Sequence, residues 1–247
     1  MRLAICLFLV GLTYNPIHAQ ETKPQDILQN LQAQQQQIIS QLNDIRQLLA
    51  AVMRPPQPSE PPSALATKDE LFRGASDASV AIIEYADFEC PFCGQYEYEV
   101  YPRISKDYIQ TGKVKYFYRD MPLPEHPHAM IAARAARCAG EQGKFWEMHD
   151  SLFAKQNLLR DVDMPGRAAD LGLDAGKFSE CLSSDRYTDE VKRSANEAEK
   201  LGIDGTPSFF VGIASPDGTV TNLKMILGMR PYDAFKSAIE DTLAAKK

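Results

Sequence analysis

The sequence predicts an α/β domain with a block of inserted helices, preceded by a helical stalk. Three observations support this class. Strand-like and helix-like segments alternate from about residue 67 onward, apolar residues repeat in heptads through residues 25–54, and a proline-rich segment separates the two regions. A composition of 44% hydrophobic and 24% charged residues is that of an ordinary globular protein. Because the net charge is −6, we expect no nucleic-acid partner.

Residues 1–19 have the pattern of a secretory signal peptide. Arg2 supplies a positive charge, residues 3–12 are apolar but too few to span a bilayer, and Ala19 is a small residue at a cleavage point. The alternative is an uncleaved anchor. We therefore expect cleavage near Ala19 and export to an oxidising compartment, such as a bacterial periplasm.

Cleavage removes Cys6 and leaves two pairs of cysteines, Cys90 with Cys93 and Cys138 with Cys181. The first two are adjacent in the sequence, which favours a second pair between Cys138 and Cys181. A bridge there would close a loop of about 44 residues and contribute about 4 kcal/mol in the chain-entropy model. Two buried free thiols, or a second redox pair, are the alternatives to this structural disulfide.

The stalk is predicted from a heptad seam in residues 25–54. Seven of the eight seam positions are apolar, namely Leu28, Leu31, Ile38, Leu42, Ile45, Leu49 and Val52, and the eighth is Gln35. A lone helix of this length is marginal in water, so its apolar seam needs a cover. Self-association into a homo-oligomer is the favoured interpretation, and a helix folded back on its own domain is the alternative. Five prolines in residues 55–63 then predict an extended linker over 55–66, ahead of a domain over 67–247.

The domain shows strand and helix patterns in a definite order. We expect strands at 79–86, 113–119, 208–213 and 219–227, helices at 90–109 and 231–245, and a long helical insert at about 126–198. The order is strand–helix–strand, then strand–strand–helix, with helices inserted between the halves. This is the order of a thioredoxin fold with a helical subdomain. Phe145, Trp146, Phe153 and Phe178 are expected to form the core of that insert.

The segment Cys90-Pro91-Phe92-Cys93 lies where the first strand gives way to the first helix. The first sulfur would then lie at a helix N-terminus, where free N–H groups and the helix dipole stabilise a thiolate. Pro91 suits the first helical turn, where its missing N–H is no loss. We predict that Cys90 is the nucleophile of disulfide exchange and that Cys93 resolves the mixed disulfide. Half of a zinc site is the alternative, but no two further ligands stand at the usual spacing.

Three motifs together resemble one family. Residues 80–93, Gly143-Lys144-Phe145-Trp146-Glu147-Met148-His149 and Gly205-Thr206-Pro207-Ser208-Phe209-Phe210 resemble, in order, landmarks of the DsbA-like thiol:disulfide oxidoreductases. The resemblance covers residues 70–247. This family belongs to the thioredoxin superfamily. Together with the predicted stalk, the resemblance indicates the isomerase-like or ScsC-like members, which oligomerise through N-terminal segments.

Glu84 lies in the middle of an otherwise apolar strand, six residues before Cys90. Burial should raise the pKa of its carboxyl group. The resemblance implies that Glu84 moves the proton of Cys93. The alternative is a structural ion pair, with Arg119 on the neighbouring strand as the candidate partner.

The resemblance also implies that Pro207 is cis and faces the active-site pair, with the backbone of Thr206 free to bind an extended substrate. An ordinary trans proline that opens an edge strand is the alternative. His126, His128 and His149 show no pattern that converges with a cysteine, so we interpret them as solvated or core side chains.

The residues around the pair favour correction of disulfides. Phe92 stands where the strongest oxidants of the family carry histidine, so Cys90 should be less acidic than in those members. Thr206 and the stalk resemble the isomerases. We therefore expect a periplasmic disulfide isomerase or dual oxidase/isomerase without a cofactor or a metal. The alternatives are a dedicated oxidase, a copper-handling protein that uses Cys90 and Cys93, as the ScsC-like resemblance implies, and a catalytically silent holdase.

The expected partners follow from this function. They are unfolded or misfolded exported proteins and membrane redox partners of the DsbB or DsbD type. Leu at seam positions a and Ile or Val at positions d shifts a coiled coil toward more than two strands. Because the isomerases that the chain resembles are often dimers and the coil is short, we favour a dimer, with a trimer or tetramer as the alternative.

Overall fold

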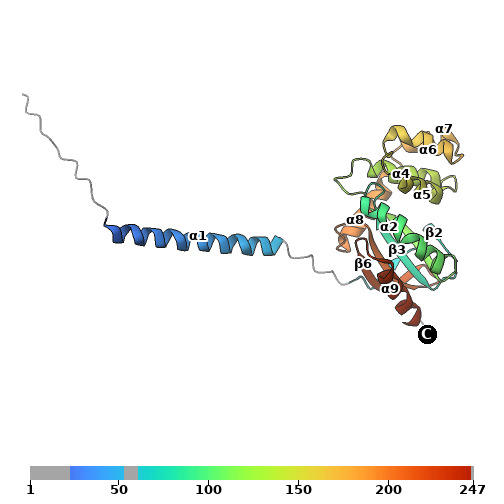
Figure 1. The fold of residues 1–247 in the computed structure, drawn as a ribbon. Coiled ribbons are helices and arrows are strands. Elements are labelled where there is room, and N and C mark those ends of the chain that lie inside the picture. The colour runs from blue at the N-terminus through green and yellow to red at the C-terminus, as the bar shows by residue number, and fades with distance from the viewer. Residues whose placement is uncertain (1–22, 53–60, 246–247) are drawn as a thin grey trace, which may run out of the picture. The chain divides into compact units, whose positions relative to one another are not determined.

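The computed structural model describes residues 23–52 and 61–245, and the chain divides into one unit over residues 1–57 and a second over 58–247. The first unit contains the helix α1 (Pro24–Val52), as the heptads predict (Figure 1). The signal peptide predicted at residues 1–19 and most of the proline-rich linker lie outside the described residues. Within the described segments, no helix combines the length and the apolarity that crossing a membrane requires.

The second unit is built on a six-stranded sheet with the order β1-β6-β5-β3-β4-β2. Its central strands are β3 (Val80–Ala86) and β4 (Val114–Asp120), which pair in parallel, and β5 (Ser208–Ala214) and β6 (Thr219–Leu227), which pair antiparallel. Every residue of β3 is buried, which explains its nearly continuous apolar sequence. The predicted fold class, a thioredoxin fold with a helical insert, is confirmed.

Two short edge strands were not predicted. β1 (Ala64–Ala66) pairs with β6, and β2 (Phe72–Arg73) pairs with β4. The predicted linker boundary at residue 66 is therefore wrong, because Leu65 is buried in the domain. Strands of two or three residues show too little alternation to be recognised in a sequence.

The two faces of the sheet carry different helices. Ile82 and its even-numbered neighbours in β3 face α2 (Pro91–Glu99), α3 (Tyr101–Ile104) and α9 (Tyr232–Ala245). The odd-numbered residues face the opposite core, which includes Ala198 of α8 (Thr188–Lys200). The single helix predicted over 90–109 is broken into α2, α3 and a π-helical turn η1 (Ser105–Ile109). Pro102 explains the break, because it lacks the N–H and clashes with the preceding turn.

The predicted insert forms four helices before α8. They are α4 (Ala129–Gly140), α5 (Phe145–Ala154), α6 (Met164–Asp170) and α7 (Ala175–Ser183), with a 3₁₀ turn η2 (Asp161–Asp163). They gather at one end of the domain (Figure 1), around a core that contains Phe145, Phe153 and Phe178, with Trp146 partly buried against it. A disulfide between Cys138 of α4 and Cys181 of α7, with Cα atoms 5.7 Å apart, joins two of these helices.

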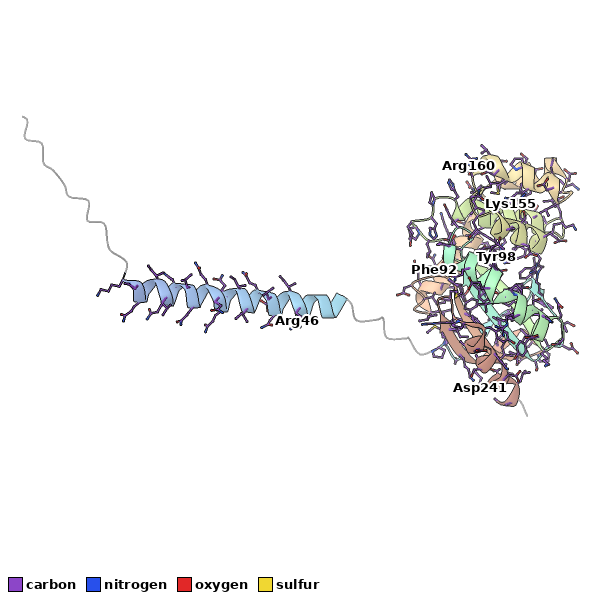
Figure 2. All side chains as sticks on the ribbon, in the orientation of Figure 1. Arg46, Phe92, Tyr98, Lys155, Arg160 and Asp241 are labelled. Atoms are coloured by element: carbon purple, nitrogen blue, oxygen red, sulfur yellow. A yellow bond between two sulfur atoms is a disulfide. The ribbon has the colours of Figure 1, made fainter. Side chains whose placement is uncertain are left out.

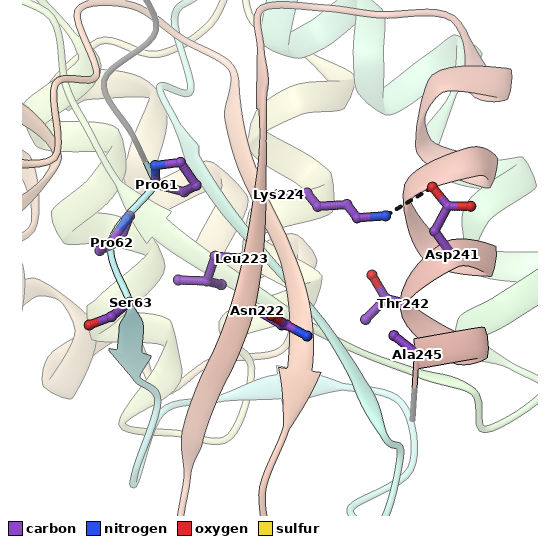
Figure 3. A pocket seen from close by; sticks show the side chains of 9 residues that line it. All are labelled: Pro61, Pro62, Ser63, Asn222, Leu223, Lys224, Asp241, Thr242 and Ala245. Atoms are coloured by element: carbon purple, nitrogen blue, oxygen red, sulfur yellow. Dashed lines mark hydrogen bonds and ion pairs between the residues drawn. The ribbon is translucent and has the colours of Figure 1, made fainter. Parts of the chain in front are cut away.

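A surface hollow of about 540 Å³ lies between β6, α9 and residues 61–63 (Figure 3). Lys224 of β6 reaches across it and donates to Asp241 of α9 at 2.9 Å. Neither active-site cysteine lines this hollow, so its size gives no reason to place the chemistry there.

Candidate active site

Cys90 and Cys93 lie at the start of α2, directly after the carboxyl end of β3. Cys90 is the N-cap residue and Pro91 the first helical residue, and the Gly94 N–H donates to the Cys90 carbonyl at 3.1 Å. Both cysteines are free thiols, and their exposed fractions are 3% and 0%. Phe92, between them, is 60% exposed, and Tyr98, further along α2, is 62% exposed; both residues are labelled in Figure 2.

The two sulfurs have opposite acid–base properties. Hydrogen bonds from the Cys93 thiol and from the backbone N–H groups of Cys93 and Phe92 lower the pKa of Cys90 to about 6 despite burial. Burial raises the pKa of Cys93 well above its ordinary value, and the hydrogen bond to Cys90 and the charge of Glu84 add to this. At neutral pH the pair therefore holds a thiolate at Cys90 and a protonated thiol at Cys93.

Glu84 is fully buried in β3, behind the cysteine pair. The Tyr116 hydroxyl donates to Glu84 Oε2 at 2.6 Å and lies 3.2 Å from the Tyr96 hydroxyl. Burial raises the pKa of Glu84 to about 8, although the Tyr116 hydrogen bond opposes the shift. Glu84 can therefore gain or lose a proton near neutral pH.

The candidate ion pair between Glu84 and Arg119 does not form. Glu84 and Arg119 lie on opposite faces of the sheet, because Arg119 pairs in register with Tyr85 rather than with Glu84. Arg119 donates instead to the Tyr85 hydroxyl at 2.6 Å, to Glu197 at 3.1 Å and to Glu70 at 2.7 Å. Alternation along β3 explains the difference, since adjacent residues point to opposite faces.

Thr206 and Pro207 lie opposite the cysteine pair, just before β5. The peptide bond between them is cis. Cys90 Sγ lies 3.4 Å from the Thr206 carbonyl oxygen, to which only the protonated thiol can donate, and this distance places the loop against the reactive sulfur. Both residues were predicted for this site, and Thr206 contacts Cys90 directly.

Two polar side chains near the pair were missed. His126, in the loop after β4, lies with Nδ1 2.8 Å from Oδ2 of Asp87, a residue just after β3. Partial burial lowers the pKa of His126, but the hydrogen bond and charge of Asp87, together with the charge of Cys90, raise it overall. His126 therefore has Asp87 as its direct partner, a contact that its interpretation as a solvated or core side chain did not include. The signal was available, because the carboxyl ends of neighbouring parallel strands meet at one edge of a sheet.

Two further side chains, Glu97 and His149, lie close to Glu84 behind the pair. Ligand atoms of these three residues lie within 4.8 Å of one another. Of the residues that the structure describes, they form the one group of three acidic, histidine or cysteine side chains close enough to hold a cation. The group contains neither cysteine, so it gives no support to the copper-handling alternative.

Gln156 of the insert holds the cysteine turn in place. Its Nε2 donates to the carbonyls of Phe88 and Cys90, each at 2.9 Å. Gly94 makes room for it, because a Cβ there would lie 2.2 Å from the Gln156 carboxamide oxygen. The glycine one residue after Cys93 therefore serves the contact between insert and active site.

We expect Gly94→Ala to lower the free energy of unfolding by about 1 kcal/mol, because displacement of Gln156 leaves a buried carbonyl without its donor. In a chain that already carries Gln156→Ala, Gly94→Ala should instead raise the free energy of unfolding by up to about 1 kcal/mol, because alanine is more favourable than glycine in a helix. Urea denaturation of the four chains measures the coupling. Equal effects of Gly94→Ala in both backgrounds would show that Gln156 does not depend on the glycine.

Comparisons with known proteins agree with this geometry. Residues 66–227, well over half of the chain, match the family model described as Thioredoxin. Disulfide bond formation protein D of Bacillus subtilis is 28% identical over 190 residues, which cover 72% of this chain and 79% of that protein. The crystal structure of α-DsbA1 from Wolbachia pipientis superposes with a TM-score of 0.63 at 23% identity, covering 72% of this chain and 92% of that one.

Another relative has a name unrelated to disulfide chemistry, and it matches this chain over only a part of its own length. The Na⁺/H⁺ antiporter NhaA 3 of Salinispora tropica is 43% identical over 140 residues, which cover 56% of this chain and 21% of the antiporter. The chain thus spans about a fifth of the length of that relative. Taken together, the family match, the sheet order and the helical insert show that this chain belongs to the thioredoxin family and has the fold of its DsbA-type members.

Proposed function

We propose that the chain is a thiol:disulfide oxidoreductase that acts on exported proteins as a disulfide isomerase or dual oxidase/isomerase. The observation that carries this proposal is the pair of adjacent thiols with opposite pKa shifts at the start of α2. The Bacillus subtilis relative, named as a disulfide bond formation protein, supports the same chemistry.

The reaction uses Cys90, Cys93 and Glu84 in turn. The Cys90 thiolate attacks one sulfur of a substrate disulfide, forms a mixed disulfide and releases the other substrate sulfur as a thiolate. Cys93 then transfers its proton to the Glu84 carboxylate and attacks Cys90 Sγ. The Cys90–Cys93 disulfide forms, and the substrate leaves as a thiolate. The reverse sequence oxidises a substrate dithiol.

The surroundings of Cys90 support isomerisation over oxidation alone. An isomerase needs a nucleophilic Cys90 and a surface that holds a misfolded chain. The side chain of Phe92 adds no charge or hydrogen bond to the pair and, because the residue is 60% exposed, it offers an apolar contact next to the sulfur. The backbone of Thr206 lies within reach of the same sulfur and can hydrogen-bond to an extended substrate strand. A dedicated oxidase is the second candidate, supported by the name of the same relative.

Self-association through α1 is part of the proposal. Within the first unit, each apolar seam residue from Leu28 to Ile45 is 52–59% exposed. An apolar stripe of this length needs a cover, and a second copy of the same helix supplies one with matching heptads. Export through a signal peptide, a periplasmic location and membrane redox partners of the DsbB or DsbD type complete the proposal.

The test is the refolding of scrambled ribonuclease by the mature full-length chain and by two stalk variants. Ile38→Asp/Leu42→Asp places charges in the seam and should convert the oligomer to a monomer with reduced isomerase activity. Gln36→Asp/Ser40→Asp adds the same charges on the opposite side of α1 and should change neither. Light scattering gives the oligomer size.

Each outcome of this test bears on a separate part of the proposal. A monomeric seam variant with full isomerase activity would refute the role of the stalk. If light scattering shows that the wild-type chain is a trimer or a tetramer, the prediction of a dimer is wrong. If the wild-type chain fails to refold scrambled ribonuclease but oxidises reduced ribonuclease efficiently, the dedicated oxidase is favoured.

A further inference from the structure

Three buried polar atoms from three different elements meet inside the second unit. They are Oε1 of Glu84 on β3, Oε1 of Glu97 on α2 and Nε2 of His149 on α5, and they lie within 4.8 Å of one another. None of the three has a hydrogen-bond partner among the residues that the structure describes. Because a buried polar atom is costly without a partner, three such atoms in one place indicate a binding site rather than three separate defects.

The protein holds the two fully buried members of this group by their other polar atoms. The Tyr116 hydroxyl donates to Oε2 of Glu84 at 2.6 Å, which leaves Oε1 for the site. His149 Nδ1 lies 2.9 Å from Oδ1 of Asp150, and Arg73 forms an ion pair of 2.5 Å with the other oxygen of Asp150. Because a carboxylate only accepts, Nδ1 carries the proton and Nε2 presents its lone pair to the two glutamate oxygens.

This second set of contacts is typical of a metal site. A histidine that binds a metal through one ring nitrogen commonly donates the other N–H to a carboxylate, which fixes the tautomer and the direction of the ring. Asp150 takes that part for His149, and Arg73 fixes Asp150 in turn. The Tyr116 hydroxyl does the same for the carboxylate of Glu84.

The chemistry of the donors selects the class of metal. One imidazole nitrogen with two carboxylate oxygens suits Zn²⁺, whereas Mg²⁺ and Ca²⁺ prefer oxygen donors alone and more of them. Two carboxylates also balance the two positive charges of the ion, as burial requires. Ligand atoms of a tetrahedral zinc site lie about 3.4 Å apart, so small rotations of the side chains bring atoms now within 4.8 Å into place.

We propose that Glu84, Glu97 and His149 bind one Zn²⁺ ion. Glu97 is only partly buried, so the ion can enter from its side and keep a water molecule as the fourth ligand. The ligands come from the central strand, the active-site helix and the insert, so a bound ion joins these three parts of the domain. The inference goes beyond disulfide exchange and does not depend on it.

The experiment is a calorimetric titration of Zn²⁺ into the oxidised mature chain. Cys90 with Cys93, and Cys138 with Cys181, are then disulfides, so no thiolate competes for the metal. We expect one Zn²⁺ to bind per chain, and Tm to rise with the concentration of free Zn²⁺ because the ion binds only the folded state. Mg²⁺ at the same concentrations should neither bind nor raise Tm.

Three variants locate the ion. Glu97→Gln removes one charged ligand and should weaken Zn²⁺ binding by about tenfold or more. Asp150→Ala keeps all three ligands but removes the acceptor of the His149 N–H, and should weaken binding by about tenfold. Glu99→Gln removes an acid from an exposed position on the same helix, where it contacts only Gln95, and should leave the affinity unchanged.

X-ray absorption at the zinc edge of the loaded wild-type chain covers the case in which Glu97→Gln does not fold. It should show one imidazole and otherwise oxygen ligands at about 2.0–2.2 Å. The proposal is wrong if the wild-type chain binds no Zn²⁺ saturably, or if a folded Glu97→Gln chain binds it with unchanged affinity. A spectrum with two imidazoles would also overturn it, by placing the ion on other histidines. None of these results affects the proposed function, which ribonuclease refolding tests separately.

Discussion

A Cys90→Ser chain is expected to lose disulfide exchange completely, whereas Cys93→Ser should form mixed disulfides that persist. The difference follows from the two thiols, because only Cys90 is a thiolate at neutral pH and Cys93 is needed only for release. Non-reducing gels of the variants incubated with scrambled ribonuclease would show the trapped complex. Insulin reduction measures turnover.

The control for this prediction is a chain in which both Cys138 and Cys181 are alanine. It lacks the insert disulfide but keeps the active-site pair, so it should retain exchange at temperatures where it remains folded. Mixed disulfides formed by the Cys90→Ser chain through Cys93 would contradict the assignment of the nucleophile.

The pH dependence of the same sulfur can be predicted. With the pKa of Cys90 near 6, alkylation of the reduced chain by iodoacetamide should level off above pH 7 and fall below pH 6. Thiolate absorbance at 240 nm should titrate at the same midpoint. A midpoint near 9, the ordinary value for cysteine, would mean that the hydrogen bonds to Cys90 do not stabilise the thiolate.

The same shift affects stability with a definite sign. The pKa of Cys90 is lower in the folded state than in the unfolded chain, so its contribution is present at high pH and declines as the pH falls through about 6. The oxidised chain has no such titration. Urea denaturation should therefore show that lowering the pH from 8 to 5 reduces the stability of the reduced form relative to the oxidised form.

The sequence was sufficient for features that depend on local pattern. The buried run of β3, the cysteine turn after it and the heptads of α1 each lie within a few residues and are visible without tertiary information. Their prediction needed only periodicity and the preference of proline for the first helical turn.

The sequence was not sufficient where distant segments meet. Glu97 of α2 and His149 of α5 meet Glu84 of β3 only in the folded domain, and Gln156 reaches the cysteine turn from the residues just after α5. The contact of His126 with Asp87 depends on the parallel pairing of β3 and β4. Strand alternation could have separated Arg119 from Glu84, but only once the register of these two strands was known.

Arg119→Ala is expected to lower the free energy of unfolding by about 1 to 3 kcal/mol, because it leaves the buried Tyr85 hydroxyl without its donor, whereas Glu70 and Glu197 are 32% and 44% exposed and regain water. Only 7% of this side chain is exposed, and its donors join Glu70, Tyr85, Glu197 and the Ala66 carbonyl from four segments of the chain. Urea denaturation compares it with Arg160→Ala, which removes the ion pair of an exposed arginine with Asp163 and should have a much smaller effect.

The Arg119 variant also separates stability from chemistry. Because Arg119 and Glu84 lie on opposite faces of the sheet, its loss should weaken the fold without changing the acid–base properties of the cysteine pair. The 240 nm titration of Cys90, measured well below the unfolding transition, should keep its midpoint near pH 6 in Arg119→Ala. A shifted midpoint would mean that Arg119 influences the active site through the sheet, and would restore the coupling to Glu84 that the structure argues against.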